Sequence, residues 1–172
     1  DRGVDSIPAQ VIEKLDKDLN FGFGKNETKI IPDIFSDSNE LRKYRERILD
    51  EALQLTPRER IDIGVAHLEM GLFDVAQVVF ESVVRYEDQK EKGMYLLGLA
   101  LISGGKAIEA TILLEPFARD LTLSESSKLD FLYLMGLAFE KLSDAPKARE
   151  FFRRVFLLSP RYRDVAEKMR KN

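Results

Sequence analysis

Apolar residues recur at intervals of three and four from residue 57 to the C-terminus, with polar residues between them. This spacing is the period of amphipathic α-helices. It predicts seven helices, over about 57–70, 73–87, 90–103, 106–119, 125–142, 145–158 and 161–170. Thr56 and Glu59 form a capping box around Pro57, which marks the start of the first of these helices. Gly71 marks the end of the same helix. We expect Pro116 to bend or end the fourth helix, because it has no amide proton to donate.

The first 55 residues follow a different pattern. Residues 8–19 place apolar side chains on one side of a short helix, and residues 20–38 are too apolar for a free linker. A further helix is expected over 38–55. It lacks the spacing of small and large residues that recurs in residues 57–160. We therefore divide the chain into an N-terminal arm, residues 1–37, and a helical domain, residues 38–172, which opens with this capping helix.

Three segments within residues 57–160 repeat one another. Each has a glycine in its first helix, a small residue 12 positions later, and large apolar residues 16 and 19 positions later. The glycines are Gly64, Gly98 and Gly136, and the small residues are Ala76, Ala110 and Ala148. The large apolar residues are Phe80, Leu114 and Phe152 at the first position, and Val83, Phe117 and Val155 at the second. Because a glycine inside a helix costs about 1 kcal/mol relative to alanine, we expect a neighbouring helix to approach the backbone at each glycine. The alanines would offer a flat facing surface, and Phe80, Leu114 and Phe152 would fill the gap between successive units.

This pattern resembles the tetratricopeptide repeat (TPR) family, whose helix–turn–helix units repeat with a period of 34 residues. The first two glycines are 34 residues apart and the next two 38. The chain departs from the family at the fourth repeat position, where Arg60, Met94 and Leu132 replace the usual aromatic residue. The resemblance implies an all-α fold, an α-solenoid of three TPR units over 57–160 with flanking N- and C-terminal helices. Residues 161–172 would form the C-terminal capping helix, because one unit cannot bury its apolar face alone.

Composition narrows the chemistry that this chain can perform. Its 172 residues include no Cys and one His, which excludes disulfides, Cys-ligated zinc, iron–sulfur clusters and a multi-histidine metal site. Phe21–Lys25 contains a Gly-Lys pair but lacks the other residues of a phosphate-binding loop. We interpret His67 as a buried, hydrogen-bonded core residue, since no nucleophile and orienting acid can be placed around it. We therefore expect no enzyme activity, no cofactor and no metal.

The resemblance to the TPR family also implies where a partner would bind, because the first helices of TPR units line a groove. The implied partner contacts are Arg58, Ile61, Val65, Lys92, Tyr95, Leu99, Ile102, Tyr133 and Leu137, and the same face carries Leu68, Asp130 and Glu140. This groove is mainly apolar with two tyrosines, which suits a partner helix or an extended apolar segment better than a peptide carboxylate. The expected function is a non-catalytic scaffold or adaptor that binds another protein.

An alternative rests on the distribution of charge. Residues 147–172 carry nine basic and three acidic residues, whereas residues 57–146 carry nine basic and fifteen acidic ones. Such asymmetry can mark a docking surface for an acidic protein, with Arg149, Arg153, Arg154, Arg161 and Arg163 as its candidates. The chain would then be a regulatory or sensor TPR module of a larger protein. Its groove would be occupied by its own arm, above all by Phe21–Phe35.

Neither nucleic acid nor a membrane is an expected partner. The net charge is −3, and aromatic and basic residues are not interleaved as in RNA-binding proteins. No apolar run reaches membrane-spanning length, and no signal-peptide pattern opens the chain. We expect a cytoplasmic protein, although a targeting segment upstream of Asp1 stays open. A second copy of the chain, contacted through the N-terminal arm, is a further candidate partner.

Overall fold

The computed structural model describes residues 38–171, and all regular secondary structure in that part of the chain is α-helical. The helices are α2 (Ser38–Leu53), α3 (Pro57–Glu69), α4 (Phe73–Val83), α5 (Lys90–Ser103), α6 (Ala107–Arg119), α7 (Glu125–Lys141), α8 (Ala145–Leu158) and α9 (Val165–Lys171). The described part is therefore all-α, as the periodicity predicts. The chain divides into two units, Asp1–Leu41 and Arg42–Asn172. The helix expected over 8–19 and the apolar segment up to residue 37 lie outside the described residues.

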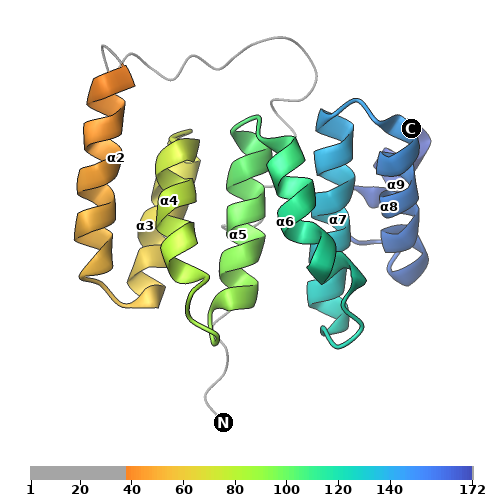
Figure 1. The fold of residues 1–172 in the computed structure, drawn as a ribbon. Helices are drawn as coiled ribbons and strands as arrows, with labels where there is room; N and C mark the ends of the chain where they lie inside the picture. The colour runs from red at the N-terminus through yellow and green to blue at the C-terminus, as the bar shows by residue number, and fades with distance from the viewer. Residues whose placement is uncertain (1–37, 172) are drawn as a thin grey trace. The chain divides into compact units, whose positions relative to one another are not determined.

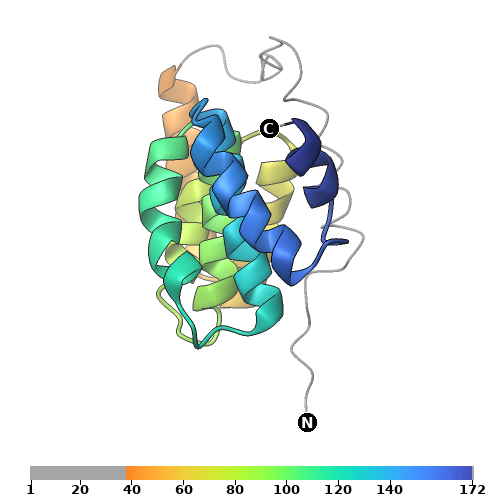
Figure 2. The same cartoon turned by 90° about the vertical axis from the view of Figure 1, so that its right-hand side faces the viewer.

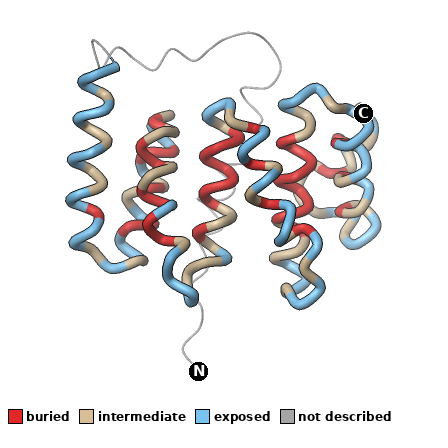
Figure 3. The backbone as a smooth tube through the Cα atoms, viewed as in Figure 1, coloured by how far each residue is buried: buried red, intermediate tan, exposed pale blue. Residues whose placement is uncertain are grey.

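Helices that follow one another in the sequence pack against one another from α3 to α9 (Figure 1). The first helices of the pairs α3–α4, α5–α6 and α7–α8 also touch, because α5 contacts both α3 and α7. Figure 2 shows the short α9 close to α8 at the C-terminal end. Buried residues concentrate on α3 to α8, whereas α2 buries only Ala52 (Figure 3). The core of the described residues therefore lies between and within the three helix pairs.

Each repeat glycine marks a close helix crossing, as the spacing predicts. A Cβ atom added to Gly64 would lie 2.3 Å from the ring of Phe80, and one added to Gly136 would lie 2.5 Å from the ring of Phe152. The same atom on Gly98 would lie 2.6 Å from the side chain of Leu114. The residue that fills each space comes from the second helix of the same pair, so these contacts close a unit internally, whereas the sequence predicts that they fill the gap between successive units. The register-matched Ala76, Ala110 and Ala148 are fully buried.

The turn between the two helices of a pair has the same backbone pattern in all three pairs. One residue in each turn is left-handed, with φ of 77° at Gly71, 79° at Gly105 and 59° at Ser143. Its amide donates to the carbonyl of Leu68, Ile102 or Glu140 at 3.1, 3.2 and 3.1 Å, in that order. The next amide donates to His67, Leu101 or Phe139 at 2.9, 2.8 and 2.9 Å. This is the Schellman motif, which ends a helix on a residue with positive φ. The third pair builds it with serine, for which this conformation is unfavourable.

Some helix ends differ from the prediction. Helix α4 ends at Val83 rather than near 87, because the chain turns there, with the Tyr86 amide donating to the Val83 carbonyl at 3.0 Å. Helix α9 begins at Val165 rather than at 161, because Arg163 has a φ of 45°, which a right-handed helix does not accommodate. Helix α6 does not end at Pro116 but continues to Arg119.

Two buried polar side chains join α2 to the first helix pair. His67 is 5% exposed, and its Nδ1 lies 2.8 Å from the Ile63 carbonyl, which can only accept. Nδ1 therefore carries the proton, and Nε2 accepts from the Tyr44 hydroxyl at 3.0 Å. This confirms His67 as a hydrogen-bonded core residue. Arg60, also 5% exposed, donates to the carbonyls of Leu55, Leu53 and Ser82 at 3.1, 3.1 and 3.4 Å. Its cation thus faces the C-terminal ends of α2 and α4, where the helix dipole is negative.

Candidate protein-interaction surface

The residues predicted to contact a partner lie on the first helices of the three pairs, but only some of them are accessible. Five are buried, with exposed fractions of 5% or less: Ile61, Leu99, Ile102, Tyr133 and Leu137. Arg58 is exposed, and Val65, Lys92 and Tyr95 are partly exposed. The apolar members of the predicted groove other than Val65 are thus covered, and a partner could reach them only by displacing what covers them.

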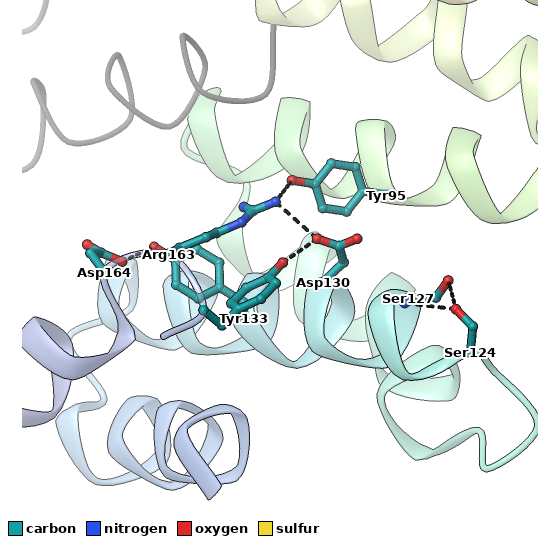
Figure 4. A network of polar contacts seen from close by, with 8 residues as sticks. Tyr95, Ser124, Ser127, Asp130, Tyr133, Arg163 and Asp164 are labelled. Carbon is teal, nitrogen blue, oxygen red and sulfur yellow. Dashed lines mark hydrogen bonds and ion pairs between the residues drawn. The ribbon is translucent and has the colours of Figure 1, made fainter. Parts of the chain in front are cut away.

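The α7 part of this surface is contacted by the chain's own C-terminal segment, which we define as Tyr162–Lys168. Arg163 donates through Nη2 to the Tyr95 hydroxyl at 2.9 Å and to Asp130 Oδ1 at 3.0 Å (Figure 4). The Tyr162 hydroxyl donates to the same Asp130 oxygen. These contacts join α5 and α7 to the residues before α9.

Two more contacts continue along α7. The Tyr133 hydroxyl donates to the Asp164 carboxylate, and the Lys168 ammonium donates to Glu140 at 2.6 Å. Asp130, Tyr133, Leu137 and Glu140 follow the spacing of one helix face. The C-terminal segment therefore follows the α7 face that the sequence assigns to a partner.

Arg163 is the centre of this arrangement. Its side chain is 11% exposed. Its guanidinium carbon lies 5.8 Å from the ring centroid of Tyr95, 5.0 Å from that of Tyr133 and 5.1 Å from that of Tyr162. These distances are typical of cation–π contacts. The backbone of Arg163 has a φ of 45°, which costs an L-residue about 1–2 kcal/mol. The side-chain contacts hold the residue in this unfavourable conformation.

The environment of Asp130 perturbs two ionisable groups. Burial raises the pKa of Asp130 above its ordinary value, against the opposing effects of the Tyr162 hydrogen bond and the Arg163 charge. Burial also raises the pKa of Tyr162, with contributions from the adjacent Asp130 charge and hydrogen bond. The Tyr162 hydroxyl therefore stays protonated at neutral pH and remains a donor to the carboxylate.

The N-terminal end of α7 is also tied to α5. Ser124 caps α7 and accepts from the Ser127 amide at 3.1 Å. The Ser127 hydroxyl in turn donates to Glu91 at the start of α5. These contacts hold α7 beside α5, so that Tyr95 and Asp130 face the same guanidinium (Figure 4).

The predicted basic surface is smaller than the sequence suggests. Arg149, Arg153 and Arg161 are exposed. Arg154 is half-buried and donates to the Ala118 carbonyl at 3.2 Å. Arg163 does not lie on this surface, because its side chain points into the Asp130 contact. The basic face thus consists of one stripe on α8 and the residue that follows Pro160.

Sequence reasoning did not assign Tyr162 or Asp164 to the partner surface. The apolar spacing after residue 160 was continuous with that of a helix, which placed both residues inside the capping helix. Arg163 lies 33 residues from Asp130 and 68 from Tyr95. No local pattern reports contacts over such separations.

Other candidate chemistry in the described residues is limited. Residues 38–171 contain no group of three His, Asp or Glu side chains placed to hold a metal ion. Phe21–Lys25, with its Gly-Lys pair, lies outside the described residues. None of the helices in the described part has the length and apolar character needed to cross a bilayer. Comparison with protein-family models, with curated proteins and with solved structures finds no match for this chain.

Proposed function

We propose that this protein is a non-catalytic scaffold or adaptor, built as an α-solenoid of three TPR-like units with flanking helices. The observation that carries the proposal is the repeated crossing of Gly64 with Phe80, Gly98 with Leu114 and Gly136 with Phe152. The matching positions of these crossings and of the turns support one supersecondary unit that recurs three times. Stacked units of this kind present extended surfaces on their first helices, and such surfaces suit protein binding.

The accessible part of the binding surface consists of Arg58, Val65, Lys92 and Tyr95 on α3 and α5. Val65 and Tyr95 supply apolar and aromatic contact area, and Arg58 and Lys92 add two cations on the same helices. This combination suits an amphipathic helix or an extended apolar segment, which would lay apolar side chains against Val65 and Tyr95. Tyrosine is an effective anchor because it buries a large area at a low cost in rotamer entropy.

A pulldown with paired variants tests this surface. The variant Val65→Glu with Lys92→Glu changes the patch, and Arg149→Glu with Arg153→Glu is the matched control on exposed α8 positions. Partners identified by mass spectrometry should be lost from the first variant and kept by the second. Equal recovery by wild type and the α3–α5 variant would rule out this surface.

The second candidate is a regulatory or sensor module of a larger protein whose partners bind the basic C-terminal face. The exposure of Arg149, Arg153 and Arg161 favours it. The same pulldown separates the two candidates, because here the α8 variant loses the partner. In this candidate the N-terminal arm occupies the groove, so deletion of residues 1–36 should increase binding to the α3–α5 surface. An unchanged level of binding after the deletion would argue against occupation by the arm.

A further inference from the structure

We propose that the α5–α7 surface is a binding site for an arginine side chain of a partner segment, and that Arg163 of the chain's own C-terminal segment occupies this site until the partner displaces it. The inference rests on the proposed function, because it gives the chemistry of a partner for the same first-helix surface. It also identifies a segment that covers part of the predicted groove.

The geometry of the site selects a guanidinium. One nitrogen of Arg163 donates both to the Tyr95 hydroxyl, at 2.9 Å, and to the Asp130 carboxylate, at 3.0 Å. The planar group lies 5.8 Å from the ring centroid of Tyr95 on α5 and 5.0 Å from that of Tyr133 on α7. Arginine stacks on aromatic rings and forms hydrogen bonds in fixed directions, whereas lysine is a compact and strongly hydrated charge. The site is therefore built for arginine rather than for any cation.

A second contact defines the direction of the bound segment. Lys168 pairs with Glu140 at 2.6 Å, and its side chain is 11% exposed. Asp130 and Glu140 are ten residues apart on α7, which corresponds to about 15 Å along the helix axis. The chain's own segment bridges them with two cations five residues apart. A partner that replaces it would present an arginine followed by a second basic residue at a similar distance, so the partner is a basic segment.

The conformation of the C-terminal segment makes exchange feasible. Arg163 has a φ of 45°, so its backbone is relaxed when it leaves the site. Helix α9, which follows it, is only 7 residues long, and a helix of that length has little stability of its own. Displacement of the segment also uncovers Val165, which is fully buried, so the partner segment has to cover that position in its place.

A direct binding experiment tests the inference. The full chain carrying Arg163→Gly removes the guanidinium and weakens the hold of the C-terminal segment on the site, and glycine accepts the positive φ without strain. The probe is a fluorescent synthetic peptide with the sequence of residues 160–170, and its matched control is the same peptide carrying Arg163→Lys. The arginine peptide should bind the Arg163→Gly chain at least about tenfold more tightly than wild type, because the wild-type segment is held on the site by its own arginine. Binding should weaken at least about tenfold with the lysine peptide or after adding Asp130→Asn to the chain.

Three results would overturn the inference: equal affinity for the arginine and lysine peptides, equal affinity of wild type and Arg163→Gly for the arginine peptide, or binding that is insensitive to Asp130→Asn. If circular dichroism shows that Arg163→Gly loses helix, the full chain carrying Arg163→Lys replaces it, and the same comparisons apply. A chain that loses its cellular partners on Val65→Glu with Lys92→Glu, yet shows no arginine preference, keeps the proposed function and loses this inference.

Discussion

The crossing of α7 and α8 at Gly136 leads to a prediction whose sign depends on the neighbouring side chain. In Gly136→Ala, the new methyl group would lie 2.5 Å from the nearest ring atom of Phe152, which is fully buried. Overpacking of this kind costs about 1–3 kcal/mol. Replacing glycine by alanine inside a helix recovers about 1 kcal/mol. We therefore expect Gly136→Ala to lower the free energy of unfolding by up to roughly 2 kcal/mol.

A double-mutant cycle isolates the contact. In the Phe152→Ala background the ring is gone, so Gly136→Ala should become neutral or stabilising by up to about 1 kcal/mol. The coupling between the two positions should then be about 1–3 kcal/mol. Urea unfolding followed by far-UV circular dichroism measures all four chains. Two results would contradict the claim that residue 136 is a glycine because the Phe152 ring lies against it. These are a Gly136→Ala chain more stable than wild type and an effect of equal size in both backgrounds.

Three further predictions concern a turn, a buried cation and a buried carboxyl. Ser143→Gly should raise the free energy of unfolding by about 0.5–1 kcal/mol, because relief of the left-handed conformation outweighs the added entropy of the unfolded chain. A loss of stability would contradict the Schellman motif at this turn. Arg60→Met should cost about 2–4 kcal/mol by leaving buried carbonyls without a donor, whereas the exposed neighbour Arg58→Met should change stability by less than about 0.5 kcal/mol. Because burial raises the pKa of Asp130, its ionised form is disfavoured in the folded state. Asp130 therefore adds to the free energy of unfolding as the pH falls from its raised pKa toward the ordinary pKa of an aspartate. Arg163→Met should raise that pKa further, as NMR titration of the carboxyl carbon would show, and a lowered pKa would contradict the ion pair.

The fold of the described residues was largely predictable because its determinants are local and repeat in register. The capping box of Thr56 and Glu59 is present, with the Glu59 carboxylate accepting from the Thr56 amide at 2.8 Å. The predicted start of α7 after Ser124 is also observed. Caps and helix periods involve residues within one or two turns of each other, so the sequence alone reports them.

The candidate site was only partly predictable. The sequence placed Tyr95 and Tyr133 on first helices, where they lie. It did not predict that Tyr133 is buried or that Arg163 points inward, because both outcomes depend on how a segment from the end of the chain packs. Arginine is usually solvent-exposed, and burial of its side chain requires partners that the local sequence does not reveal.

The sequence by itself determined most of the helix boundaries, the three repeated segments and the positions at which helices must cross closely. These features follow from backbone hydrogen bonding, side-chain volume and capping, which act over short distances along the chain. Only the tertiary structure decided that Tyr162–Lys168 lies along α7 and that Asp130 has an arginine as its partner. Those contacts join residues 28 to 68 positions apart, and their formation depends on the complementarity of packed surfaces rather than on any periodicity in the sequence.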